Sequence, residues 1–260
     1  LFACENVVRR LRDLKTVGVI SENDVTGITE IADPVGVVCG IVPTTNPTST
    51  TIFKSLIALK TRNPIIFSFH PSAQQCSAHA AQIVRDAAIA AGAPENCIQW
   101  IEKPSMEGTS ALMKHPGVAT ILATGGNAMV EAAYSCGKPA LGVGAGNVPA
   151  YVEKTANIQQ AAHDIVMSKA FDNGMICASE QAVIADKEIY KELVEEFKSY
   201  GVYFANKKEK AMLEDFIFGV TANCANCGGA KLNSAVVGKP AAWIAEQAGF
   251  KVPEKTNIII

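Results

Sequence analysis

The sequence lacks any dense run of lysine and arginine, and it lacks an uninterrupted apolar stretch long enough to cross a bilayer. Its 23 basic and 25 acidic residues nearly cancel, which argues against an electrostatic nucleic-acid surface. A secretory pattern of basic start, apolar middle and small-residue cleavage site is also missing. We therefore predict no membrane and no nucleic-acid partner, and expect any anionic ligand to be held by local amides and a few cations.

Metal-ligand spacing is missing as well. The four histidines show no such spacing to one another; they are His70, His79, His115 and His163. One CxxC pair, Cys224 and Cys227, has no second pair or histidine beside it to complete the roughly four ligands that zinc needs. The sequence therefore predicts no metal site.

The eight cysteines form no evident disulfide framework, although the chain has 260 residues. Most of them lie in apolar or helical surroundings, where a free cysteine behaves as a small hydrophobic residue. A chain of this length without a disulfide pattern is typical of a reduced compartment. We expect a cytoplasmic protein.

Short apolar runs alternate with longer helical patterns from about residue 35 onward. The expected strands are 35–42, 64–69, 97–101, 118–123 and 139–143, and the expected helices between them are 47–60, an Ala-rich helix capped by Ser72, 105–114 and 126–134. This alternation predicts an α/β fold with a mostly parallel, doubly wound sheet. In such sheets ligands bind at the carboxyl ends of the strands, where 43–46, 68–70 and 124–126 fall.

The pattern changes after Tyr151. We expect a helix over 157–170, a strand over 181–185 and a charged amphipathic helix over 187–200. A domain boundary near residue 152 follows, giving domains 1–152 and 153–260. The chain starts inside a helical pattern and stops in the apolar run 257–260, so we expect a fragment with a partial helical segment at its start and an incomplete second domain.

Cys177 is the first chemical candidate. It lies in the segment FDNGMICASEQ, residues 171–181, among small and polar residues with Gly174 just before it. A thiol in this setting is accessible, and the reactivity of its thiolate depends on exposure and on nearby amide donors or positive potential. A buried cysteine beside a turn is the alternative that this segment alone leaves open.

A second segment, GIVPTTNPTST at residues 40–50, combines with the first into a recognisable pattern. Further stretches in the same order are FKSL (53–56), LKTRN (59–63), LATGG (122–126) and GVGAGN (142–147). From about residue 30 to the end, the chain resembles the aldehyde dehydrogenase superfamily. The similarity is closest to the coenzyme A-acylating branch, in particular the aldehyde dehydrogenase half of bifunctional aldehyde–alcohol dehydrogenases.

The resemblance implies roles for two residues. Cys177 matches the family's nucleophile, and Asn46 matches the asparagine that forms the oxyanion hole with the nucleophile's backbone N–H. Such a donor typically contributes ~3–4 kcal/mol of transition-state stabilisation. An asparagine before Pro47 could instead serve only as a helix cap. The resemblance favours the oxyanion role.

The resemblance also implies NAD as cofactor, with residues 1–152 as its domain and 153–260 as the catalytic domain. The residues that would line the nicotinamide and ribose side are Ile41, Val42, Pro43, Thr44 and Thr45, next to Asn46. Gly126, at a helix start, would let backbone amides approach the pyrophosphate, and Gly144 would lie near the nicotinamide. Turn geometry is the alternative reason for each glycine. His70 follows a strand, and it either borders the adenosine ribose or occupies a plain loop position.

An absence in one of these motifs separates two branches of the family. Hydrolytic aldehyde dehydrogenases carry a glutamate in the motif that matches residues 143–147, where it activates the water that releases the acyl group. Here residues 141–150 contain no acid. We therefore expect acyl transfer to the thiol of coenzyme A. Glu180, close to Cys177 in sequence, is the alternative base.

The resulting prediction is a coenzyme A-acylating aldehyde dehydrogenase that interconverts acetaldehyde, or another short aldehyde, with acetyl-coenzyme A. One alternative is a hydrolytic aldehyde dehydrogenase. The other is an inactive fragment with an assembly role, because the bifunctional relatives form helical filaments. By resemblance we expect a homo-oligomer, filament-forming in the full-length protein, and no metal in this part.

Overall fold

The computed structural model describes residues 3–219 and 232–260, and it divides into two compact units, Leu1–Ala145 and Gly146–Ile260. The Cys224–Cys227 pair lies outside the described residues. Across the two described ranges, no helix combines the length and the apolar character that a membrane span requires.

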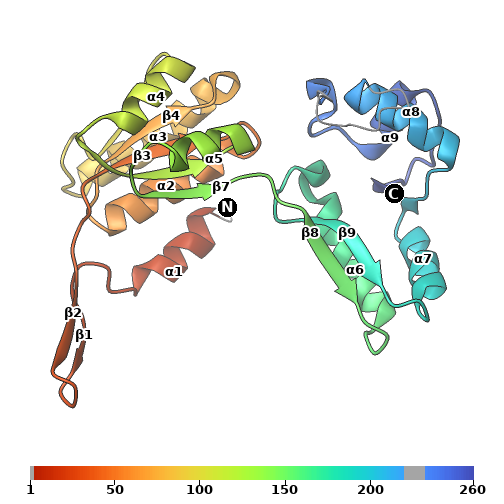
Figure 1. The fold of residues 1–260 in the computed structure, drawn as a ribbon, viewed down its shortest axis with the longest axis horizontal. Helices are drawn as coiled ribbons and strands as arrows, with labels where there is room; N and C mark the ends of the chain where they lie inside the picture. Colours follow the sequence, from red (N-terminus) through yellow and green to blue (C-terminus); the bar gives the residue numbers. More distant parts are fainter. Residues whose placement is uncertain (1–2, 220–231) are drawn as a thin grey trace. The chain divides into compact units, whose positions relative to one another are not determined.

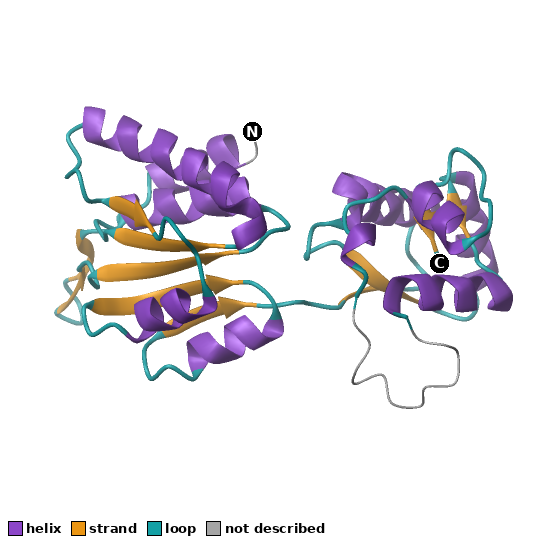
Figure 2. Ribbon diagram, turned by 90° about the horizontal axis from the view of Figure 1, so that it is seen from above, coloured by secondary structure: helices purple, strands orange, loops and turns teal. Residues whose placement is uncertain are grey.

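A five-stranded parallel sheet forms the centre of the first unit (Figure 1 and Figure 2). Its strand order is β5-β4-β3-β6-β7, and every pair is parallel. The strands are β3 (Val37–Val42), β4 (Ile65–Phe69), β5 (Ile98–Trp100), β6 (Val118–Thr124) and β7 (Ala140–Val143). The order places β3 in the middle, so that the chain winds outward first through β4 and β5 and then through β6 and β7. This confirms the predicted α/β, doubly wound fold.

Helices cover both faces of this sheet (Figure 2). On one face Ala58 and Ala81 pack with Phe67 and Ile98 in a buried core. They belong to α2 (Pro47–Lys60) and α3 (Gln74–Ala90). On the other face, Met113 and Ala133 pack against Ile121 in a second core, and these two side chains come from α4 (Met106–Lys114) and α5 (Asn127–Tyr134). The near-continuous apolar strands of the sequence are explained by this two-sided burial.

The helices over this sheet differ in how they begin. Ser105 caps α4 by accepting a hydrogen bond from the Gly108 N–H. Ser72 does not cap the Ala-rich helix, because a short helical turn (Pro71–Ala73) precedes α3. In that turn the His70 Nδ1 accepts a hydrogen bond from the Ser72 N–H at 3.2 Å. His70 thus caps this short helical turn.

The chain before the sheet contains a feature that the sequence patterns did not predict. Helical residues Ala3–Val7 and α1 (Val8–Arg12) agree with the expected segment. An antiparallel hairpin follows, formed by β1 (Gly18–Asn23) and β2 (Ile28–Ala32), and it extends away from the sheet (Figure 1). Its turn is closed by Asn23, whose side-chain oxygen accepts hydrogen bonds from two backbone N–H groups of the turn.

The second unit has its own core of apolar side chains, in which Val166, Leu193 and Phe197 are buried. Its first elements are β8 (Val148–Val152), α6 (Ile158–Ala170), the short helix η3 (Phe171–Gly174), β9 (Glu180–Ala185) and α7 (Tyr190–Ser199). The expected charged helix begins at Tyr190 and not at 187, because Asp186–Ile189 form a turn. The later elements are β10 (Val202–Tyr203), α8 (Lys207–Phe218), the short helix Ser234–Val236, α9 (Ala241–Ala248) and β11 (Ile258–Ile259).

Candidate active site

The switch point of the sheet lies between β3 and β6. The two strands are neighbours and parallel, but the chain leaves β3 toward β4 and leaves β6 toward β7. Ligands of doubly wound sheets bind in the crevice at the carboxyl ends of such a pair. Residues 43–46 follow β3 and residues 125–126 follow β6. The topology thus brings two of the segments singled out in the sequence to one edge.

The segment after β3 changes from buried to exposed within a few residues. Ile41 and Val42, the last two residues of β3, are buried in the sheet. Pro43 is half-buried, and Thr44 and Thr45 are exposed. A ligand at this edge would therefore meet the backbone of Ile41 and Val42 and the side chains of the two threonines.

Asn46 occupies the cap position of α2, but its side chain makes no capping hydrogen bond. The residue is exposed, and its Oδ1 accepts a hydrogen bond from the Thr45 Oγ1 at 3.3 Å. The Asn46 carbonyl accepts the first hydrogen bond of the helix, from the Thr50 N–H at 3.1 Å. The carboxamide is thus not used to cap α2, and its nitrogen can donate to a ligand.

The space around Gly126 differs from the space around Gly144. Gly126 is the cap residue of α5 with φ −65°, and an added Cβ would meet nothing within 4 Å. Neither backbone strain nor packing requires glycine there, so the open space suits a ligand that approaches the helix start. At Gly144 an added Cβ would lie 2.9 Å from the Asn127 Oδ1. That oxygen accepts a hydrogen bond from the Ala145 N–H, so a side chain at 144 would displace the Asn127 side chain from this contact.

Cys177 lies in the second unit on an exposed turn between η3 and β9. The chain enters this turn through three consecutive residues in the left-handed region, Asp172 (φ 51°), Asn173 (φ 50°) and Gly174 (φ 74°). Asparagine and aspartate tolerate this conformation better than other residues with a Cβ, and such strain clusters at functional sites. Ser179 is buried and donates from Oγ to the Ile176 carbonyl at 2.8 Å, which fixes the turn from the other side.

The second half of the acid-free segment, residues 146–150, belongs to the same unit as this turn. A Cβ added to Gly146 would be 3.8 Å from the Cys177 carbonyl oxygen, and Val148 pairs with Glu180 in the β8–β9 ladder. The Glu180 Oε2 is buried and makes no hydrogen bond to any described residue. Residues 146–148, which contain no carboxylate, thus lie beside the backbone of the Cys177 turn.

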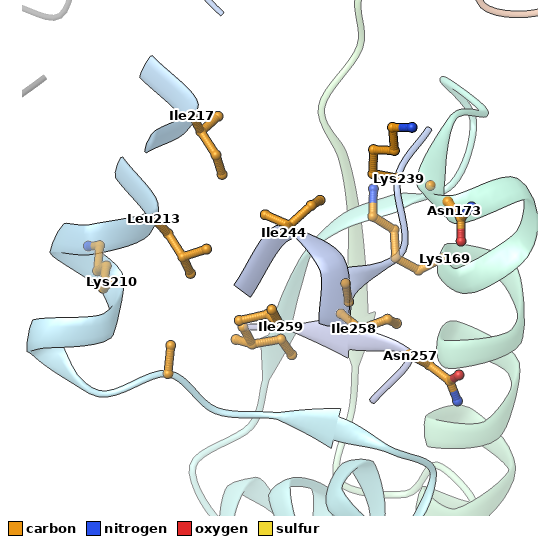
Figure 3. A pocket seen from close by; sticks show the side chains of 14 residues that line it. Lys169, Asn173, Lys210, Leu213, Ile217, Lys239, Ile244, Asn257, Ile258 and Ile259 are labelled. Carbon is orange, nitrogen blue, oxygen red and sulfur yellow. The ribbon is translucent and has the colours of Figure 1, made fainter. Parts of the chain in front are cut away.

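A cavity of about 410 Å³ opens elsewhere in the second unit (Figure 3). Apolar side chains of α8, α9 and β11 form most of its wall, among them Leu213, Ile244 and Ile259. Lys169 and Lys239 lie at one end of it, on the side of Asn173 (Figure 3). Cys177 does not line this cavity, so we assign the cavity no part in the chemistry. No cluster of three metal-ligating side chains occurs in the described part of the chain.

Lys54 is a buried cation that the sequence reading overlooked. It is 3% exposed, and its Nζ donates to the carbonyl oxygens of Ile41 at 2.6 Å and Leu122 at 2.7 Å. Burial lowers its pKa to about 7. The sequence carried one signal of this, because Lys54 shares helical spacing with the other buried positions of α2, which are Thr50, Thr51, Ser55 and Ala58.

Known proteins match the chain throughout. The family model described as "Aldehyde dehydrogenase family" matches residues 3–212. The aldehyde-alcohol dehydrogenase of Streptococcus pneumoniae serotype 4 is 80% identical over 259 residues, which are 100% of this chain and 29% of the relative. The chain therefore spans less than a third of that relative's length.

Solved structures agree in fold. The crystal structure of an acetylating aldehyde dehydrogenase from Geobacillus thermoglucosidasius is 48% identical with a TM-score of 0.91, and the match covers 100% of this chain and 55% of that chain. A propionaldehyde dehydrogenase of Rhodopseudomonas palustris with bound propionyl-CoA is 38% identical with a TM-score of 0.82, over 96% of this chain and 53% of that one. These matches confirm the resemblance found in the sequence. The chain belongs to the aldehyde dehydrogenase family.

Proposed function

We propose that the protein is an NAD-dependent, coenzyme A-acylating aldehyde dehydrogenase. It interconverts acetaldehyde, or another short aldehyde, NAD and coenzyme A with acetyl-coenzyme A and NADH. The observation that carries the proposal is the exposed Cys177 on a strained turn, together with the lack of any acid in residues 141–150, of which Gly146 lies beside the Cys177 backbone. An accessible thiol supplies the nucleophile, and the missing carboxylate disfavours water as the second nucleophile.

Cys177 and Asn46 carry out the first half of the reaction, the formation of a thioester on the protein. The Cys177 thiolate adds to the carbonyl carbon of the aldehyde, and the carbonyl oxygen becomes an alkoxide. The Asn46 carboxamide and the Cys177 backbone N–H donate hydrogen bonds to that oxygen. When the alkoxide collapses, hydride leaves the carbon and a thioester remains on Cys177. The exposed, uncapping side chain of Asn46 supports its assignment as a donor.

NAD supplies the hydride acceptor when it is bound. We assign its nicotinamide and ribose side to residues 41–46 and its pyrophosphate to the helix start at Gly126. The open space where a Gly126 Cβ would stand fits a close approach of backbone amides to phosphate oxygens. Gly144 is assigned to the nicotinamide edge, although its contact with Asn127 gives it a packing reason too.

Coenzyme A completes the second half. Its thiol loses a proton to solvent, the resulting thiolate attacks the thioester carbonyl, a new thioester forms, and the Cys177 thiolate leaves. The relative solved with propionyl-CoA supports a place for coenzyme A in this branch of the family. The direction from acyl-coenzyme A to aldehyde uses the same steps in reverse.

A product assay with and without coenzyme A tests the proposal against hydrolysis. We expect acyl-coenzyme A as the product and little free acid when coenzyme A is left out; free acid at full rate without it would overturn the acylating assignment. Replacing the proposed nucleophile, Cys177→Ser, should stop product formation. Cys76→Ser is the matched control, because Cys76 is also exposed but lies on a helix of the first unit.

We also propose a cytoplasmic homo-oligomer, filament-forming in the full-length protein. The six cysteines of the described ranges are all free thiols, as in a reducing compartment. Exposed apolar side chains on the β1–β2 hairpin support self-association; they are Val19, Ile20, Val25, Ile28 and Ile31. A monomeric mass in solution at micromolar concentration would count against the oligomer.

A further inference from the structure

The buried amine of Lys54 joins three elements of the first unit. It projects from the middle of α2 and donates to one carbonyl of β3, that of Ile41, and to one of β6, that of Leu122. Both distances, 2.6 and 2.7 Å, are short for N–H···O bonds and typical of a charge-assisted pair. We call this contact the lysine bridge.

The lysine bridge lies directly beneath the crevice at the switch point. Ile41 and Leu122 come shortly before the ends of β3 and β6, and the loops that follow carry Asn46 and Gly126. α2 begins right after Asn46, so the bridge ties the helix carrying that residue to both strands. Among side-chain hydrogen bonds of the described residues, none other joins α2 to both β3 and β6.

A lysine is a costly way to fill this position. Desolvation of a buried ammonium disfavours folding, and a well-packed apolar side chain of similar volume is often as stable or more stable. A lysine at such a position is therefore expected to serve a purpose other than stability. The position of the amine between the two crevice strands supplies one.

We propose that Lys54 is a positioning residue that holds the 43–46 loop and the 125–127 helix start in the spacing that NAD requires. The proposal rests on the assignment of this crevice to NAD. A positioning role differs from a stabilising role in its consequence. If Lys54 only positions the loops, losing the lysine bridge weakens NAD binding and leaves the stability of the fold unchanged.

Lys54→Met in the full chain separates these roles, since methionine fills similar volume and donates nothing. We expect the melting temperature to stay or rise, while the NAD dissociation constant rises about tenfold, the equivalent of ~1.4 kcal/mol, because the spacing of the two loops is no longer held. The matched control is Lys60→Met, which removes the Lys60 bond to the Arg12 carbonyl at the far end of α2. The control should bind NAD as the wild type does.

Hydrogen exchange provides a readout that does not depend on NAD. In Lys54→Met we expect about tenfold faster exchange confined to peptides that cover 41–47 and 122–128. Unchanged NAD affinity, unchanged local exchange, or a uniform loss of protection over the first unit would each overturn the proposal.

Two further outcomes are decided by the same measurements. If the wild type does not bind NAD, the proposed function fails, and local exchange alone decides whether the bridge positions the two loops. If Lys54→Met does not fold, Lys54→Gln, which keeps an N–H donor on a shorter side chain, is measured in its place by the same two readouts.

Discussion

The stability of the first unit should depend on pH through Lys54, and Lys54→Met should remove this dependence. Burial lowers the pKa of the amine from 10.5 to about 7 in the folded chain. Between these two values the unfolded chain binds more protons than the folded one, so the stability of the wild type rises with pH. Below about pH 7 the folded chain bears the whole free-energy cost of holding a protonated amine in its interior. The cost is roughly 5 kcal/mol, at 1.36 kcal/mol per pH unit of pKa shift.

The pH range in which the wild type and Lys54→Met are best compared runs from pH 7 to pH 9. The titratable group that faces the amine is the Cys39 thiol on β3, with Cys136 beyond it. Burial raises the pKa of Cys39 to about 12, so this thiol stays protonated in the folded chain throughout the window, and it is present in both variants. From pH 7 to pH 9 the wild type should gain roughly 2 kcal/mol relative to Lys54→Met.

Urea unfolding at fixed ionic strength measures this difference. The chain has two tryptophans, Trp100 in β5 and Trp243 in α9, so a Trp243→Phe background leaves Trp100 as the fluorescent reporter of the first unit. The free energies of unfolding of the two variants should converge as pH rises. Parallel curves over the window would refute the reasoning, because they would mean that Lys54 is not buried as an amine with a lowered pKa.

Four substitutions test the assigned residues. Cys177→Ser should abolish the burst of NADH while the NAD dissociation constant stays near the wild-type value; unchanged turnover would remove Cys177 from the mechanism. Asn46→Ala should lower kcat ~10²–10³-fold in steady-state assays with little change in melting temperature, and a merely capping asparagine would show the reverse. Gly126→Ala should fold normally but bind NAD more weakly in direct titration, since its Cβ meets only open space; equal affinity would contradict the pyrophosphate assignment. Gly144→Ala should lower the melting temperature at a cost of about 1–3 kcal/mol, because its Cβ strikes the Asn127 Oδ1; an unchanged melting temperature would show that the loop yields.

The main sheet could be predicted because its strands are short apolar runs between helices with clear starts and stops. The β1–β2 hairpin could not be predicted in this way. Its strands are largely exposed, so no alternation of buried and exposed residues marks them, and only the turn at Asn23–Gly27 hints at it. The start of α3 was misplaced because Pro71–Ala73 form a short helical turn of their own before it, capped by His70.

The candidate site was predicted in part. Cys177 was expected to be accessible, and it is exposed; Asn46 was found by its motif, and the structure adds that its side chain is not used for capping. Lys54 was missed because a lysine in a helix is normally solvated, and only the stripe of buried positions around it signals otherwise. The roles of Cys177, Asn46, Gly126 and Gly144 in catalysis and binding stay predictions.

The run of left-handed residues before Cys177 limits how this part of the chain can vary. Asp172 and Asn173 already hold a conformation that a β-branched side chain adopts only at high cost, and Gly174 has no Cβ to oppose it. A valine or isoleucine at 172 or 173 would push the backbone toward another path and carry the thiol with it. The backbone conformation of these positions therefore narrows the choice of amino acids there and, through it, constrains where the sulfur lies.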